Sequence, residues 1–143
     1  MKVLLVANTG WYLYNFRAAL ANKLVQEGFE VKMVFPYDEF TGEIEARGFQ
    51  TIHWKLERQS AAPFSELKSI LDLGKIYRRE KPTLVHHFTI KPVTYGSLAA
   101  RINNVPATIN SITGRGFVFL GSTIKAAYLR PMVRLLYNIS YYR

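Results

Sequence analysis

Apolar residues recur along this chain in two patterns that alternate from start to end. Short, mostly apolar runs of strand length occur at 2–7, 30–35, 49–54, 83–88 and 106–112. Segments with apolar residues every three or four positions, the spacing of a helix that buries one face, occur at 14–27, 39–48, 63–81 and 92–103. Strands that alternate with helices predict an α/β fold with a parallel sheet and right-handed crossovers.

The same pattern locates the loops where a ligand would bind. Parallel sheets of this kind bind ligands outside the carboxyl ends of their strands. The predicted strands lead into the loops 8–13, 36–38, 55–62, 88–91 and 113–121. No repeat, low-complexity tract or Gly/Ser linker divides the sequence, so we expect a single domain over residues 1–143.

The composition excludes several classes of protein. The chain has no cysteine, which excludes a disulfide framework and every thiolate metal site. Its start, MKVLLVANTG, has an apolar run of five residues, which is shorter than the apolar core of a signal peptide. No run approaches the roughly 20 apolar residues that a membrane span needs. These features predict a cytoplasmic protein.

Positive charge is concentrated in the second half of the sequence. Residues 1–80 hold eleven Lys or Arg and all ten acidic residues, and thus net +1. Residues 81–143 hold eight Lys or Arg and no acidic residue, and thus net +8. This asymmetry indicates an anionic partner, which would be phosphate groups, nucleic acid or anionic lipid.

His86 and His87 are the first candidates for chemistry. As neighbours on a predicted strand they point to opposite faces of the sheet, so they cannot hold one metal ion together. No carboxylate or thiolate follows them in the sequence, and we expect no metal site. One ring is expected to pack under a helix as a hydrogen-bonded core histidine, and the other to lie where a ligand can reach it.

The turn after the histidines has the features of an anion seat. Thr89 can cap the helix that follows, and Pro92 suits a first helical turn because it has no amide hydrogen to satisfy. The free amides of that turn, with Lys91 beside them, would attract an anion. The alternative is that Thr89 is only a cap and Lys91 only a solvated charge.

Two loops contain glycine in patterns relevant to phosphate binding. The turn Asn8-Thr9-Gly10 has one glycine where a dinucleotide-binding motif has three, and the sequence contains no P-loop. NAD binding and ATP hydrolysis are therefore disfavoured and no cofactor is expected, although a polar turn before a helix suits a phosphate. In residues 113–116, two glycines flank Arg115, whose guanidinium matches phosphate oxygens. The alternative is an ordinary loop with one surface arginine.

Residues 122–143 mix basic and aromatic side chains and are similar to an interfacial membrane segment. The side chains expected to contact an anionic surface are Lys125, Arg130, Arg134 and Tyr137. The alternative is a core helix at a domain edge. No helix-turn-helix, zinc-finger or RNA-recognition motif is present, so a nucleic-acid partner is not expected.

Three stretches together resemble a known family. They are MKVLLVANTGWYLYNFRAALANKLVQEGFEV, HHFTIKPVTYGSLAAR and NSITGRGFVF. They resemble the amino-terminal domain of glycosyltransferase family 4 type enzymes, in particular bacterial members that build surface polysaccharides on polyprenyl-diphosphate carriers. The resemblance implies a GT-B fold, in which each of two domains is a Rossmann-like three-layer sandwich. It also implies an acceptor held mainly by the amino-terminal domain, a nucleotide-sugar donor held mainly by the second domain, and retention of anomeric configuration without a bound metal.

The resemblance also implies roles for particular residues. Asn8, Thr9 and Gly10 would lie near the donor diphosphate, and His87, at the end of the fourth strand, would face the transferred sugar as the catalytic candidate. Many family members have a second histidine two positions after the first, where this chain has Phe88. The other expected substrate-binding residues are Thr89, Lys91, Thr113, Gly114, Arg115 and Gly116.

Family members continue into a second domain that holds the donor, so we expect this chain to be a fragment or a truncated frame that transfers no sugar by itself. The complete enzyme would be a hexosyltransferase acting on a lipid-linked or glycan acceptor, peripheral on the inner face of the cell membrane. One alternative is half of a nucleotide-sugar epimerase. Another is a non-catalytic basic module that binds anionic lipid or nucleic acid.

Overall fold

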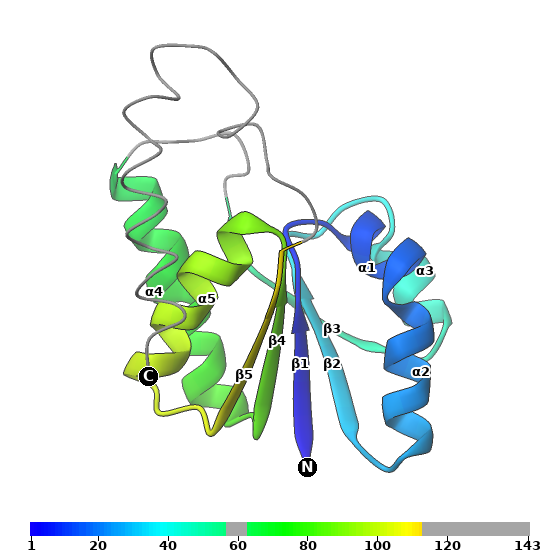
Figure 1. Cartoon of the computed structure of the whole chain (residues 1–143). Helices are drawn as coiled ribbons and strands as arrows, with labels where there is room; N and C mark the ends of the chain where they lie inside the picture. The colour runs from blue at the N-terminus through cyan, green and yellow to red at the C-terminus, as the bar shows by residue number, and fades with distance from the viewer. Residues whose placement is uncertain (57–62, 113–143) are drawn as a thin grey trace.

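The computed structural model describes residues 1–56 and 63–112 of the chain (Figure 1). They form five strands and five helices, with two helices between the first and second strands and one helix between each later pair of strands. The strands are β1 (Lys2–Val6), β2 (Glu30–Phe35), β3 (Gln50–His53), β4 (Leu84–Phe88) and β5 (Ala107–Ser111). The helices are α1 (Gly10–Phe16), α2 (Ala18–Gln26), α3 (Thr41–Ala46), α4 (Pro63–Glu80) and α5 (Ile90–Ile102).

All neighbouring strands pair in parallel, in the order β3-β2-β1-β4-β5. Helices α1, α2 and α3 cover one face of the sheet, and α4 and α5 cover the other (Figure 1). The predicted α/β fold with a parallel sheet is therefore confirmed, and so is its three-layer form. Because β2 and β4 lie on opposite sides of β1, the order of the strands reverses at the boundary between β1 and β4. A crevice at such a boundary is the usual ligand site of an open parallel sheet.

The central strand β1 is buried on both faces, which explains its continuous apolar sequence. Leu4 and Val6 belong to the core under α4 and α5, whereas Val3 and Leu5 belong to the core under α1, α2 and α3. The register pairs Val6 of β1 with Val34 of β2. The carboxyl ends of these strands thus lie side by side at one edge of the sheet, which we call the rim.

The structure differs from the predicted helix over 14–27. The chain is already helical at Gly10, because the side chain of Thr9 accepts a hydrogen bond from the amide of Tyr12 and so caps the helix. Arg17, with φ −127° and ψ −5°, then separates α1 from α2. Periodicity detects the apolar face that α2 buries, but it does not detect this cap or this break.

Candidate functional site

The turn after β1 lies at the rim, as expected, but its amides already have an acceptor. The amides of Gly10 and Trp11 donate to Oδ2 of Asp38 at 2.8 and 3.3 Å. The other oxygen of Asp38 accepts from the amide of Phe40 at 3.1 Å. The carboxylate of Asp38 therefore occupies the position at the start of α1 where the sequence predicted a phosphate.

Gly10 is required by this close approach of two loops. A Cβ at Gly10 would lie 2.4 Å from Oδ1 of Asp38 and 2.7 Å from a ring carbon of Phe35. The single glycine of the turn thus makes room for the end of β2, and the observed packing needs no further glycine of a dinucleotide-binding motif. The turn therefore needs glycine at position 10, where Asp38 and Phe35 approach the backbone closely.

A cavity of about 490 Å³ opens beside this turn. Its lining residues are Asn8, Thr9, Trp11, Tyr12, Asp38 and Glu39. The lining combines aromatic faces, an amide and two carboxylates, and none of these residues is basic. Carboxylate and amide oxygens accept hydrogen bonds from hydroxyl groups, and they repel phosphates. The rim cavity therefore suits a neutral ligand rich in hydroxyl groups better than an anion.

Arg17 brings a positive charge to the edge of this cavity. Its guanidinium lies 4.6 Å from the ring centroid of Phe88 and 5.1 Å from that of Tyr12, and donates to the Tyr12 hydroxyl. Both distances are within the range of a cation–π contact. Arg17 thus links the end of β4 to the wall of the rim cavity. The sequence did not single it out, because it falls inside the predicted helix 14–27.

His86 packs on the same face of the sheet. Its ring centroid lies 4.1 Å from that of Phe88, and its Nε2 is hydrogen-bonded to the hydroxyl of Ser111 at 2.8 Å. Burial lowers the pKa of His86 to about 4, and the positive charge of Arg17 adds to that effect. His86 is therefore neutral at physiological pH. It is the histidine that faces the α1 side, as the alternation of a strand requires.

His87 points to the opposite face and is fully buried under α4 and α5. Its Nδ1 donates to the amide oxygen of Asn110 at 2.8 Å, and its Nε2 accepts from the hydroxyl of Tyr77 at 2.7 Å. This placement differs from the expectation that His87 faces the transferred sugar. A buried ring whose two nitrogens are both occupied has no free atom for a ligand. His87 is the core histidine of the pair.

Thr89 lies at the rim between β4 and α5, but it is not the expected helix cap. Its side chain makes no hydrogen bond at the helix start, and its buried Oγ1 has no partner among the described residues. Its backbone has φ 71° and ψ 169°, a conformation that is almost confined to glycine. The rim thus holds a strained backbone position at the boundary between β1 and β4, and such strain is common at functional sites.

Lys91 lies in the first turn of α5, yet its charge is compensated. Its ammonium lies 2.9 Å from Oε1 of Glu66 on α4, and the hydroxyl of Tyr95 donates to the other oxygen of that carboxylate. Lys91 therefore joins α5 to α4, and the expected anion seat at this turn lacks an uncompensated lysine. The remaining predicted residues lie outside the described residues: Thr113, Gly114, Arg115, Gly116, Lys125, Arg130, Arg134 and Tyr137.

Within residues 1–56 and 63–112, no three His, Asp or Glu side chains gather in a way that could hold a metal ion. Within the same ranges, no helix has both the length and the apolar character needed to cross a bilayer.

The Glycosyl transferase 4-like family matches residues 2–141, so the chain belongs to this family. A curated relative from Campylobacter jejuni subsp. jejuni serotype O:2 (strain ATCC 700819 / NCTC 11168) is 26% identical over 141 residues, which cover 99% of this chain and 38% of the relative. That relative is the N,N'-diacetylbacillosaminyl-diphospho-undecaprenol alpha-1,3-N-acetylgalactosaminyltransferase.

Solved structures support the fold. MurG from Acinetobacter baumannii matches with a TM-score of 0.59 and 24% identity, over 76% of this chain and 33% of that protein. A UDP-N-acetylglucosamine 2-epimerase matches with a TM-score of 0.63 and 16% identity, over 98% of this chain and 39% of that protein. The chain thus has the α/β fold of GT-B glycosyltransferase domains, as expected, and spans well under half the length of these relatives.

Proposed function

We propose that this chain forms the acceptor-side domain of a retaining glycosyltransferase of the hexosyltransferase type. The complete enzyme would move a sugar from a nucleotide-sugar donor, held mainly by a second domain, to a lipid-linked or glycan acceptor. Membership of the Glycosyl transferase 4-like family supports the transfer chemistry. The Campylobacter jejuni relative acts on a diphospho-undecaprenol-linked sugar, which supports a lipid-linked acceptor.

The observation that carries the proposal is the rim cavity at the boundary between β1 and β4. Carboxylate oxygens of Asp38 and Glu39 and the amide of Asn8 can accept and donate hydrogen bonds to sugar hydroxyls. Trp11, whose side chain is exposed beside the cavity, offers an apolar face for the C–H groups of a pyranose ring. We assign this cavity to the sugar of the acceptor.

The anionic parts of the substrates need positive groups. In our proposal these are Arg17 and, from outside the described residues, Arg115 with the neighbouring Thr113, Gly114 and Gly116. Lys91 orders the junction of α4 and α5 through Glu66, and His86 supplies a neutral ring on the α1 side. Catalysis would come mainly from electrostatic stabilisation of the departing nucleotide diphosphate, to which a fixed guanidinium contributes without reorganisation.

We further propose that the complete enzyme is peripheral on an anionic membrane surface. In this proposal Lys125, Arg130, Arg134 and Tyr137 contact the headgroups of the lipids. The concentration of positive charge in residues 81–143 supports this contact, because each basic residue near an anionic surface contributes about 1 kcal/mol. The acceptor, when it is linked to a lipid, is then bound from the surface in which it is anchored.

A transfer assay tests the proposed function. The complete enzyme is incubated with nucleotide-activated N-acetylgalactosamine, with and without an undecaprenyl-diphosphate-linked sugar, and the products are identified by NMR. We expect transfer that requires the acceptor and a product with the anomeric configuration of the donor. We expect no transfer by residues 1–143 alone, because the donor is assigned to a second domain. Conversion of the free nucleotide sugar to its epimer, without use of the acceptor, would instead establish the epimerase alternative.

A further inference from the structure

Helix α4 has large apolar side chains on its outward face. Phe64, Leu67 and Leu71 are 83%, 52% and 56% exposed, although their spacing places them on one side of the helix. The opposite side of α4 is the one that packs in the core, through Leu73 and Tyr77, which are fully buried. The exposed residues therefore form a second apolar stripe that contributes nothing to the core.

Lysines lie on the same outward face. At 100° per residue, Lys68 and Lys75 fall within an arc of about 100° that also contains the apolar stripe. Among the described residues, neither lysine makes an ion pair or a side-chain hydrogen bond. The outward face of α4 thus combines apolar groups with two lysines that form no ion pair among the described residues.

Two of the three carboxylates of α4 form ion pairs with lysines on other elements. Glu66 binds Lys91 at 2.9 Å, and Glu80 binds Lys32 at 2.8 Å. Asp72 accepts the backbone amide of Lys55 at 3.0 Å. Asp72 keeps its negative charge in this contact, so Lys68, Lys75 and Asp72 together leave this side of α4 with a net positive charge.

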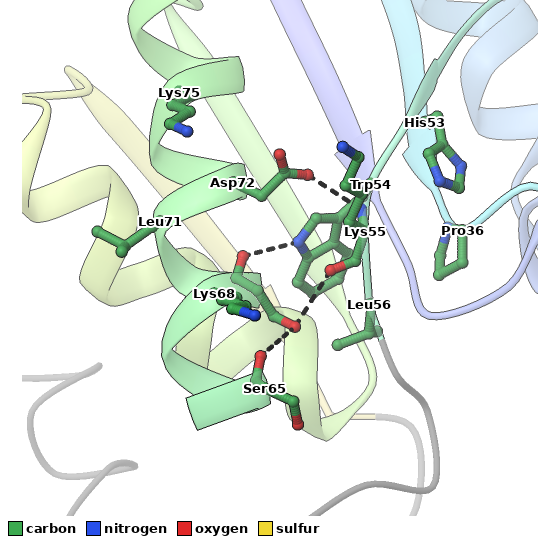
Figure 2. A pocket seen from close by; sticks show the side chains of 11 residues that line it. Pro36, His53, Trp54, Lys55, Leu56, Ser65, Lys68, Leu71, Asp72 and Lys75 are labelled. Carbon is green, nitrogen blue, oxygen red and sulfur yellow. Dashed lines mark hydrogen bonds between the residues drawn. The ribbon is translucent and has the colours of Figure 1, made fainter. Parts of the chain in front are cut away.

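A hollow of about 460 Å³ lies beside this face, between the end of β3 and α4 (Figure 2). Its charged lining residues are Lys55, Lys68, Lys75 and Asp72, and Leu71 lies beside them. Its inner wall is fixed by the indole of Trp54, which donates to the carbonyl of Ser69 at 2.9 Å. The three lysines outnumber the one carboxylate, so the hollow has a net positive lining that attracts a phosphate group.

We propose that this surface, formed by Phe64, Leu67, Lys68, Leu71 and Lys75, docks on a bilayer that contains anionic lipids. The apolar stripe enters the boundary between headgroups and acyl chains, and the lysines bind headgroup phosphates. Helix α4 begins at the rim edge of the sheet, so docking brings the rim close to the membrane surface (Figure 1).

A bilayer fits this surface better than other partners. A nucleic acid would contact the lysines but leave the apolar stripe in water. A second copy of the chain, in a two-fold symmetric contact, would set lysine against lysine in the same patch. A bilayer with anionic lipids offers apolar and anionic groups at adjacent depths along the whole face. The inference goes beyond the proposed function, which places membrane contact at residues 122–143, and it depends on no step of sugar transfer.

Co-sedimentation of the protein with vesicles tests the inference. One set of vesicles is phosphatidylcholine alone, and the other also contains phosphatidylglycerol. We expect binding to the anionic vesicles only, and a decrease at high salt. The double variant Lys68→Gln/Lys75→Gln should lower the partition coefficient about 25-fold, since each lysine contributes roughly fivefold. Phe64→Ala should lower it about tenfold.

A control variant removes two lysine charges from other parts of the surface. Lys23→Gln/Lys81→Gln changes an exposed lysine on α2 and one that follows α4, and should change binding less than about twofold. Circular dichroism should show all variants folded, because every changed side chain is exposed. Equal binding of the Lys68→Gln/Lys75→Gln variant and the unchanged protein would overturn the inference, and so would a dimer that depends on Phe64. Neither result would bear on the transferase proposal, because the assay contains no donor or acceptor.

Discussion

Acidification from neutral pH to pH 4 is expected to lower the free energy of unfolding by about 3 kcal/mol through His87 alone. Burial lowers the pKa of His87 from 6.5 to about 4; the hydrogen bond that His87 donates to Asn110 raises the pKa, and the nearby His86 lowers it. In the unfolded chain the ring takes up a proton near its ordinary pKa. At this ring the unfolded state therefore binds more protons than the folded state between about pH 6.5 and 4, and stability is lost as the pH falls through this window.

Urea unfolding at a series of pH values measures this effect. His87→Gln removes the titrating ring, so stability should change less between pH 6.5 and 4 than in the unchanged protein. Tyr77→Phe is the control, because it removes the hydrogen bond to Nε2 but keeps the ring. It should lower stability at every pH and keep the dependence on pH. If the stability of the His87→Gln variant depended on pH as strongly as that of the unchanged protein, His87 would not be a buried neutral group.

Replacement of Asp38 with alanine is expected to lower kcat/KM for the acceptor about a hundredfold in the complete enzyme. The change leaves the amides of Gly10, Trp11 and Phe40 without their acceptor and removes a carboxylate from the rim cavity. The turn that positions the acceptor sugar would then shift. Small shifts of groups that position a substrate produce losses of this size.

Two further variants separate the roles of Asp38. Glu39→Ala removes the second carboxylate of the rim cavity and should give a smaller loss, about tenfold, because a single hydrogen bond to a charged group is removed. Glu45→Ala removes an exposed carboxylate outside the cavity and should leave kcat/KM unchanged. Steady-state kinetics with varied acceptor gives the values, and thermal unfolding shows that each variant is folded. Full activity of a folded Asp38→Ala variant would exclude the rim cavity as the acceptor site.

Much of the fold follows from local patterns in the sequence. Strand β2 occupies the predicted residues 30–35, since its apolar run is bounded by a glycine turn and a proline. Helix α4 begins at the predicted Pro63 and ends one residue before the predicted end. These elements are specified by their own residues. The start of α1 at Gly10 was missed because it depends on a cap and on Asp38, which periodicity does not register.

The sequence predicts where the candidate site lies, but not which side chains interact there. The order of strands and helices indicates that the turn at Asn8 and the end of β4 meet at one edge, and the structure confirms that arrangement. The chemistry at that edge depends on pairs far apart in sequence. Asp38 lies 28 residues after Gly10, and Glu66 lies 25 residues before Lys91. No local spacing reveals such pairs. The sequence therefore predicts anion binding at amides and at a lysine that, in the structure, already bind carboxylates of this chain.

Amide hydrogen exchange with a water-soluble analogue of the acceptor glycan tests most directly whether the rim cavity binds the acceptor sugar. We predict that the analogue slows exchange at the amides of residues 10–12 and 38–40, which surround the cavity, and that Asp38→Ala abolishes this protection. Protection confined to other parts of the chain, with unchanged exchange around the cavity, would contradict the assignment.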